Sequence, residues 1–518
     1  MPRRTRPPSA WQITGQETRR CIYLCERFPG MAESSRLVSQ PGGQEERRPT
    51  GDAAVGDDER GGSSLDTILN VINIAFGAGM LGLPYAIQGA GLLSGVAGMG
   101  IVLYWNYYCC ALLVKLRDEV LKARTNAAEG SALAADEGKP VSFVAMGNYA
   151  MGTVGTVLVC ISVVVTLLGA ATAYFINANE LLRKTRFYLN PGWSEDTAMY
   201  ANTLIYMCIM YPLTCIKSLA PLSRLSFPAI CALVAGFAVI IKLGLDMHGW
   251  PPAEEVISWE GLYIPRTFAG FSTFFGTAAF SYGATIIIPN IQESMERTDD
   301  FMGALQTSLW IIWGSYSVLG GVSLVIYQQQ GPVSDNIMAQ LPSGSAAQEP
   351  LLLFITAATL LTYPLAMQPV SSMLTEALLH AGFGGGAERM AKSGRYGALS
   401  AAETGTTTPT AGGDGPPAEG EGKDRLPLAL YYGLRAGLVL FTAVGATSVP
   451  NFGVVVSLLG SFSVTLGSFV LPPLFHRVVF GDRLSALEKA VDEFLVLLGV
   501  VTCAFTTATT ALGQINGG

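Results

Sequence analysis

The stretch "FGAGMLGLPYA", from Phe76 to Ala86, places three glycines and a proline within a long apolar segment. The glycines have the G-x-G-x-x-G spacing of dinucleotide-binding folds, where the motif follows a β-strand and opens a soluble helix. Here the stretch lies inside a run of apolar residues from Leu65 to Gln88, and no strand precedes it. The sequence therefore places these glycines inside a membrane span and argues against a dinucleotide site.

The composition of the whole chain also indicates a membrane protein. Half of the 518 residues are hydrophobic, 14% are charged and the mean hydropathy is +0.39, whereas about a quarter of the residues are charged in an ordinary soluble domain. The apolar residues gather into stretches close to the roughly 20 residues that a helix needs to cross a bilayer. We therefore expect an all-α integral membrane protein of about eleven transmembrane helices. These helices are expected at residues 65–88, 91–116, 154–182, 200–215, 225–245, 267–291, 301–327, 351–379, 426–446, 454–475 and 490–512.

The loop charges predict the orientation. If the N-terminus is cytosolic, 26 of the 32 Lys and Arg fall on the cytosolic side and four on the other side, as the positive-inside rule requires. We expect residues 1–62, rich in Arg, Pro, Gly and Ser, to form a disordered cytosolic tail. The transporter domain is then expected at 63–514, with a low-complexity cytosolic loop at 381–425.

The glycines and the proline predict an interrupted helix. Glycine destabilises a helix interior by about 1 kcal/mol relative to alanine, and proline removes a hydrogen-bond donor. The sixth stretch repeats this pattern in "AFSYGATIIIPNIQESM", Ala279–Met295, where Gly283 precedes Pro289 by six residues. Either break alone is compatible with a packing kink. Two breaks at matching places favour a secondary transporter with a five-plus-five inverted repeat, broken helices 1 and 6, and one extra helix.

Helix breaks in a membrane suit a zwitterionic ligand. The half-helix that begins near Gly79 presents free N–H groups and a positive dipole end, which favour a carboxylate. The half-helix that ends before Gly283 is expected to present unpaired carbonyls, which favour an ammonium group or a coupling cation. Ser281 and Tyr282 supply hydroxyls beside them. An amino acid carries both charges.

Three motifs carry a family resemblance. "LNVINIAFGAGMLGLPYAIQGAG", Leu69–Gly91, resembles the first span of the amino acid/auxin permease family. "FSYGATIIIPNIQESM", Phe280–Met295, and "LLTYPLAMQPV", Leu360–Val370, resemble the sixth and eighth spans of the vesicular inhibitory amino acid transporters and their vacuolar relatives. The resemblance implies a carrier rather than an enzyme, coupled to protons or, in other branches, to sodium. A vacuolar or other endomembrane location is favoured over the plasma membrane.

The same resemblance implies the site residues. Asn73 and Thr362 match places near which cation-coupled members hold their ion, although either side chain could instead bond a neighbouring helix. Glu293 follows the second break and offers a carboxylate for proton transfer, or else a solvated interface charge. The residues expected to line the substrate site are Gly77, Ala78, Gly79, Met80, Ser281, Tyr282, Gly283 and Ala284.

We therefore expect a transporter of neutral amino acids that is coupled to protons and works by alternating access. The alternatives are sodium coupling, and an amino acid receptor that signals through the N-terminal tail. The three histidines have no metal-site spacing, and no motif of an intramembrane enzyme is present. We accordingly expect no cofactor besides the coupling ion, and as partners an amino acid and the lipid bilayer but no nucleic acid. The oligomeric state stays open.

Overall fold

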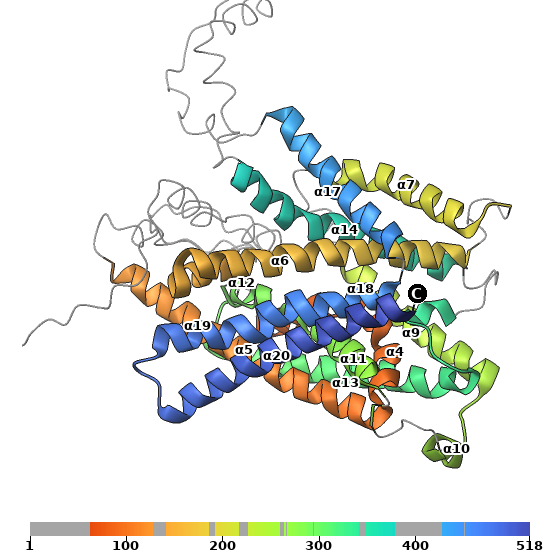
Figure 1. Ribbon diagram of the computed structural model, residues 1–518, viewed down its shortest axis with the longest axis horizontal. Helices are drawn as coiled ribbons and strands as arrows, with labels where there is room; N and C mark the ends of the chain where they lie inside the picture. The colour runs from red at the N-terminus through yellow and green to blue at the C-terminus, as the bar shows by residue number, and fades with distance from the viewer. Residues whose placement is uncertain are drawn as a thin grey trace, which may run out of the picture.

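The computed structural model describes residues 63–127, 141–185, 192–216, 226–258, 264–265, 267–293, 295–340, 349–378, 427–449 and 451–517. All elements formed by these residues are helical, and each of the eleven expected stretches contains helix. Long helices lie side by side along the molecule (Figure 1). The predicted tail at 1–62 and the predicted loop at 381–425 lie outside the described residues, so both stay predictions.

Two of the expected spans are interrupted, and they are the two that the glycine and proline pattern predicts. The first consists of α3 (Ser64–Ala75), the 3-10 helix η2 (Ala78–Gly82) and α4 (Leu83–Ala90). The sixth consists of α11 (Phe268–Ser281), the 3-10 helix η4 (Gly283–Ile287) and α12 (Ile288–Glu293).

The other elements follow in chain order. They are α5 (Leu92–Thr125), α6 (Phe143–Arg183), α7 (Glu195–Thr214), α9 (Ser226–His248), the short α10 (Ala253–Ser258), α13 (Phe301–Tyr327), η7 (Ile337–Gln340), α14 (Glu349–Leu378), α17 (Leu428–Ser448), α18 (Phe452–Leu459), the π-helical turns η9 (Gly460–Val464) and η10 (Leu466–Val470), α19 (Leu471–Phe480) and α20 (Ala486–Gly517).

Side-chain caps explain where several helices begin. Ser63 accepts a hydrogen bond from the Asp66 backbone N–H, and the Asp66 carboxylate accepts one from the Ser63 N–H, which makes a capping box for α3. Thr267 caps α11 by accepting from the Gly270 N–H at 3.0 Å. Each cap satisfies an N–H group that the first turn of a helix leaves without a partner.

Six helices in the described ranges are long and apolar enough to cross a membrane by length and composition. The full count of eleven membrane spans therefore stays a prediction. The six are Leu92–Thr125, Phe143–Arg183, Thr298–Tyr327, Leu428–Ser448, Phe452–Phe480 and Ala486–Gly513.

Two helices extend beyond their predicted boundaries. α5 continues to Thr125 instead of ending at residue 116, and α6 begins at Phe143 instead of residue 154. The extension of α5 carries charged residues that lower its hydropathy, whereas the extension of α6 carries no charge but has its apolar residues interrupted by Gly147, Asn148 and Gly152. The two extensions come together through buried side chains in a second hydrophobic cluster, which includes Val120, Phe143 and Phe475. α6 bends within its extension at Gly152, where φ is +58° and only glycine is unstrained.

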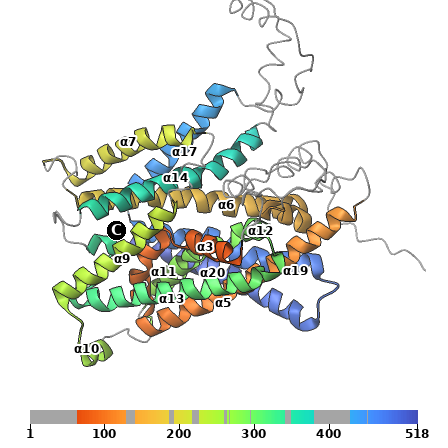
Figure 2. The ribbon, with the colours of Figure 1, turned by 180° about the vertical axis from the view of Figure 1, so that it is seen from behind.

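The helices form two groups of four spans. In the first group α3–α4, α5, α11 and α13 pack on one another, and in the second α6, α7, α14 and α17 do. Figures 1 and 2 show α7, α14 and α17 together on one side of α6, away from the first group. Each group therefore joins two successive spans of the first half with the two spans that lie five positions later. α18, α19 and α20 cover α11 and α5 of the first group.

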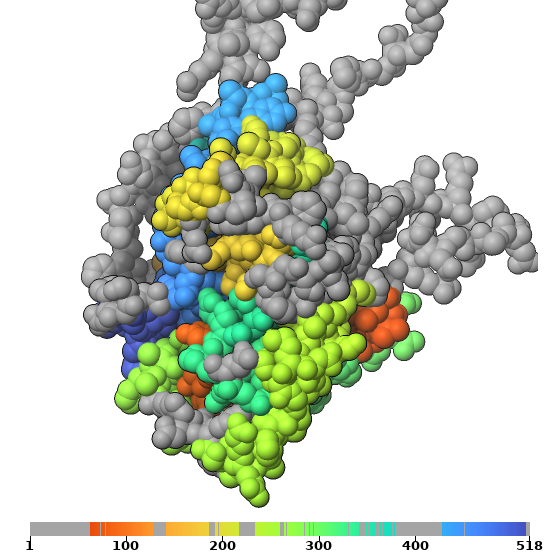
Figure 3. All heavy atoms as spheres, turned by 90° about the vertical axis from the view of Figure 1, so that its right-hand side faces the viewer, coloured from red at the N-terminus to blue at the C-terminus, as the bar shows by residue number. Residues whose placement is uncertain are grey.

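Seen from the right-hand end of Figure 1, α7 and α17 lie at the top of the molecule, and α9 lies below them (Figure 3). α9 packs on both α13 and α14. It therefore connects the two groups of helices.

Candidate functional site

The two helix breaks meet inside the molecule. After α3 ends at Ala75, the chain leaves the helix, and Gly77 is extended with φ −128° and ψ −160°. Gly79 then lies directly against the other break. A Cβ atom at Gly79 would lie 2.7 Å from Ser281 Oγ and 3.2 Å from Ser281 Cα. The structure thus brings the first and second predicted segments together, and the absence of a side chain at Gly79 permits the approach.

A buried asparagine forms hydrogen bonds with the residues of the second break. Asn106 of α5 donates its side-chain amide to the Tyr282 carbonyl at 3.1 Å and to Thr285 Oγ1 at 2.8 Å. Tyr282 has left the helix, with φ −94° and ψ 8°. Asn106 therefore replaces part of the hydrogen bonding that the broken helix has lost. Sequence reasoning missed it, although an asparagine within an apolar stretch is itself a signal.

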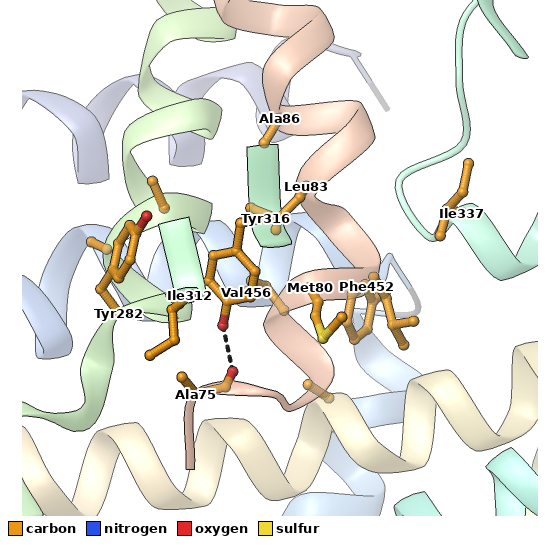
Figure 4. Close-up of a cluster of buried hydrophobic side chains, with 14 of the residues drawn as sticks. Ala75, Met80, Leu83, Ala86, Tyr282, Ile312, Tyr316, Ile337, Phe452 and Val456 are labelled. Carbon is orange, nitrogen blue, oxygen red and sulfur yellow. Dashed lines mark hydrogen bonds between the residues drawn. The ribbon is translucent and has the colours of Figure 1, made fainter. Parts of the chain in front are cut away.

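A buried tyrosine of α13 connects both breaks. The Tyr316 hydroxyl donates to the carbonyl of Ala75, the last residue of α3, and to the carbonyl of Ser281, the last residue of α11, at 3.2 Å. Its ring stacks on Phe76 at 5.9 Å and lies 5.6 Å from the ring of Tyr282. Figure 4 shows the Tyr316 hydroxyl pointing at Ala75, with Tyr282 beside the Tyr316 ring.

These contacts correct one expectation. The carbonyls that precede Gly283 were predicted to be unpaired, but Ser281 and Tyr282 both accept hydrogen bonds from side chains of other helices. The physical reason is the cost of an unpaired carbonyl in an apolar interior, which the protein avoids by supplying donors. Sequence reasoning considered only the two broken spans and therefore missed both donors.

Of the two hydroxyls predicted at the second break, one is engaged. Ser281 Oγ donates to the Thr277 carbonyl of its own helix at 2.8 Å. The Tyr282 hydroxyl has no hydrogen-bond partner within the described residues, and the residue is only 1% exposed. Ser457 and Ser461 also have buried hydroxyls without a partner in the described part of the chain. Unpaired buried hydroxyls are where a ligand or an ordered water is expected.

The remaining predicted substrate residues lie in the same two segments. Met80 is fully buried in the main hydrophobic cluster. A Cβ atom at Gly283 would lie 3.3 Å from Val464 of η9, whereas one at Gly77 would have nothing within 4 Å. Ala78 belongs to η2 and Ala284 to η4, and the structure describes only the backbone of these two residues.

The three candidates for ion coupling lie on different elements. Asn73 belongs to α3, in the first group of helices, and only its backbone is described. Thr362 belongs to α14, in the second group, and is partly buried. Glu293 is the last residue of α12 and is exposed. Their roles stay predictions.

A second polar cluster lies in the segment that follows α13. This segment lies beside Gly82, where the first break ends. Asn336 donates to Asn177 Oδ1 and to Glu180 Oε2, both at 2.8 Å. Asp335 accepts from the Gly453 N–H at 2.8 Å. The segment thus ties α6 to the start of α18. Glu180 is partly buried and lies inside the third expected span, so an acidic residue in an apolar stretch was the available signal.

A buried ionisable pair lies at the opposite end of the molecule. His476 Nδ1 of α19 donates to Asp492 Oδ2 of α20 at 2.7 Å, and the two side chains are 4% and 0% exposed. One residue further along each helix, Arg477 Nε donates to Glu493 Oε1 at 3.0 Å in a more exposed pair. Both pairs join the last two long helices.

Comparison with known proteins identifies the family. The family described as transmembrane amino acid transporter protein matches residues 60–512. This chain belongs to that family. It is similar to Amino acid transporter ANT1 of Arabidopsis thaliana, with 28% identity over 458 residues that cover 87% of this chain and 93% of that protein. It is similar to the vesicular inhibitory amino acid transporter of Mus musculus, with 23% identity over 446 residues that cover 83% and 72%.

A solved structure, that of MhsT in complex with L-phenylalanine, aligns with 87% of this chain and 99% of that chain. The identity is 10% and the TM-score is 0.49. The family match confirms the resemblance that the three motifs carry. The protein is an integral, multi-pass membrane protein of a family of amino acid transporters, which are not enzymes.

Proposed function

We propose that this protein carries neutral amino acids across an endomembrane, that a proton gradient drives the transport, and that the substrate binds where the two helix breaks meet. The contact between Gly79 and Ser281 carries the proposal, because it places the beginning of one half-helix against the end of another. The N-terminal end of η2 would then face a substrate carboxylate. The Ser281 and Tyr282 carbonyls at the end of α11 each accept one side-chain hydrogen bond and keep a second lone pair for an ammonium group. The buried Tyr282 hydroxyl adds a hydrogen-bonding group beside them.

The residues at the breaks favour a neutral side chain. Residues 76–82 and 281–287 include no acidic or basic residue. A charged substrate side chain would have no counter-charge in either segment, and burying an unpaired charge is strongly unfavourable. Aromatic and aliphatic groups such as Phe76 and Met80 would instead lie beside an apolar side chain.

Alternating access fits the two groups of helices. The first group contains both breaks, and the second contains none. If the two halves of the chain are inverted repeats, each group joins equivalent spans of both halves. Rocking of one group against the other would then expose the breaks to one side of the membrane at a time.

For proton coupling we add Glu180 to the candidate Glu293. Intramembrane carboxylates are typical of proton relays, and Glu180 lies within the third expected span while Glu293 is exposed. The groups that face Glu180 are Asp335 from the segment after α13 and Arg183 and Lys184 from its own helix. Asn336 bonds one of its carboxylate oxygens. A proton on Glu180 would therefore change the attachment of this segment to α6.

Reconstitution into proteoliposomes tests the proposal. Uptake of a panel of radiolabelled amino acids would be measured with and without an imposed pH gradient, and with sodium exchanged for choline. We expect accumulation of neutral amino acids only with the pH gradient, and no loss of uptake in choline. Loss of most uptake in choline would favour sodium coupling, with Asn73 and Thr362 as its ligands. Substrate binding without any flux would favour a receptor.

The role of Glu180 has a separate test. Glu180→Gln keeps an oxygen that can accept the hydrogen bond from Asn336, but its amide cannot take up and release a proton during transport. We expect loss of accumulation driven by the pH gradient, while exchange of labelled for unlabelled substrate persists, because exchange needs no net proton movement. Glu293→Gln is the comparison. Normal accumulation in Glu180→Gln would remove Glu180 from the proposal.

The mouse relative is a vesicular inhibitory amino acid transporter, which supports an endomembrane location for this protein. The predicted orientation places the N-terminus in the cytosol and the cluster around Asn336 on the other side of the membrane. In an acidic organelle, that side is where protons are supplied. The proposed coupling residue Glu180 would then face the proton source.

A further inference from the structure

The Tyr316 hydroxyl occupies an unusual position. It donates to the last carbonyl of α3, at Ala75, and to the last carbonyl of α11, at Ser281. Its own side chain is completely buried. The terminal carbonyls of a helix have no partner within the helix and carry the negative end of its dipole. One hydroxyl thus lies between the negative ends of two half-helices.

A position between the negative ends of two half-helices is suited to a cation. In transporters with broken helices, freed carbonyls and the C-terminal ends of half-helices coordinate the coupling cation. Hard cations such as sodium bind oxygen ligands. In this protein a neutral O–H group already bonds both carbonyls, and the Ala75 carbonyl also accepts a hydrogen bond from the Gly77 N–H at 2.8 Å.

We propose that the Tyr316 hydroxyl takes the place of a coupling cation between the ends of α3 and α11, and that it thereby makes this carrier independent of sodium. The inference rests on the proposed function, and it assigns the choice of coupling ion to one residue. Tyr316 acts as a positioning residue, because its hydroxyl bonds the ends of both half-helices.

A single hydroxyl can serve both carbonyls in turn. A hydroxyl has one proton, so it can donate fully to only one of the two carbonyls at a time. The Tyr316 ring stacks on Phe76 and lies beside the ring of Tyr282. If α3 and α11 shift relative to α13, rotation of the hydroxyl would move its hydrogen bond from one carbonyl to the other.

Replacing the tyrosine should restore a cation site. Tyr316→Asn puts an amide oxygen beside the two freed carbonyls and leaves room where the ring was. Purified protein in detergent would be unfolded by heat in sodium chloride and in choline chloride. We expect the wild type to unfold at the same temperature in both salts, and Tyr316→Asn to unfold at a temperature on the order of 2 °C or more higher in sodium. This measurement needs no knowledge of the transported substrate.

Tyr327 supplies a matched control on the same helix. It is also buried, and its hydroxyl donates to a backbone carbonyl, that of Ile240, at 2.8 Å. Tyr327→Asn should lower the unfolding temperature equally in both salts. Tyr316→Phe, which removes the hydroxyl without adding an oxygen, should lose at least tenfold in uptake and should not respond to sodium. If Tyr316→Asn does not fold, Tyr316→Ser gives the same readout.

Two outcomes would overturn the inference. One is stabilisation of the wild type by sodium, and the other is a Tyr316→Asn or Tyr316→Ser protein that unfolds identically in both salts. The failure of the proposed function would look different. In that case the wild type would show no proton-driven uptake, while the salt dependence of unfolding would still answer the question about Tyr316.

Discussion

At the scale of single residues, removal of the Tyr282 hydroxyl is expected to affect substrate binding but not the stability of the protein. It is buried without a partner in the described part of the chain, so removing it should not destabilise the protein. If the substrate bonds it, Tyr282→Phe should weaken substrate binding by roughly two- to thirteenfold, the equivalent of a net hydrogen bond of about 0.5–1.5 kcal/mol. The measurements are the KM for uptake and the unfolding temperature of the same preparation.

Tyr363 is the control for this prediction. Its hydroxyl is buried and bonds Thr442 Oγ1 at 2.7 Å. Tyr363→Phe should therefore lower the unfolding temperature and leave KM unchanged, the opposite of the result expected for Tyr282→Phe. Unchanged KM in Tyr282→Phe would place the substrate elsewhere.

Gly79 permits the contact between the breaks, and its replacement should be costly. A Cβ atom there would lie 2.7 Å from Ser281 Oγ. We expect Gly79→Ala to reduce the uptake rate at least tenfold while the protein still inserts into the membrane. Ser281→Ala removes the clashing oxygen, so the double variant should recover part of the uptake. Gly303→Ala, at an exposed position of α13 with nothing within 4 Å of the added carbon, should be close to normal.

The sequence predicts much of the site at this scale, but only the part that lies in the broken spans. The glycines and the proline near Gly79, and their counterparts near Gly283, are visible because they oppose helix formation. Tyr316 and Asn106 are not visible in the same way. Each is a single polar residue in an ordinary apolar helix, and its partner is a backbone carbonyl in a span far along the chain. No periodicity indicates such a pair.

At the scale of elements, the His476–Asp492 pair is expected to fix α19 against α20. Asp492→Ala leaves the buried His476 Nδ1 without its partner, which should destabilise the protein by about 1–3 kcal/mol. Glu493→Ala breaks the neighbouring exposed pair with Arg477 and should have an effect below about 1 kcal/mol. Thermal unfolding of both variants measures the difference. Equal losses of stability in Asp492→Ala and Glu493→Ala would contradict the expectation that the buried pair contributes more than the exposed pair.

Elements were predicted well where hydropathy defines them, and less well where it does not. Each of the eleven apolar stretches contains helix, and both interruptions lie where glycine and proline predicted them. The end of α5 was missed because its buried residues alternate with charged ones, and the beginning of α6 was missed because Gly147, Asn148 and Gly152 interrupt its apolar residues. The π-helical turns between α18 and α19 were not predicted. Their glycine and serine residues are common in membrane helices and do not indicate a π-helical turn.

At the scale of the whole molecule, the two ends differ in charge. The end that holds the turn between α19 and α20 carries Arg477 of α19 and Arg483 of the turn, each paired with a glutamate, and Lys122 and Arg124 in the last turn of α5. The opposite end carries Arg183 and Lys184 at the end of α6, and they face the carboxylates of Glu180 and Asp335 around Asn336. The positive-inside rule, which counts Lys and Arg, then places the α19–α20 turn in the cytosol.

This orientation has a direct test with exposed positions from each end. Asp482 lies in the α19–α20 turn, and Pro332 lies in the segment after α13. In sealed vesicles with the cytosolic face outward, we expect Asp482→Cys to react with a membrane-impermeant maleimide above the level of the parent protein. Pro332→Cys should react only after detergent is added, because the bilayer separates the two ends. Reaction of Pro332→Cys before detergent would place Asp335 and Glu180 on the cytosolic side, and protons would then have to reach Glu180 from the cytosol.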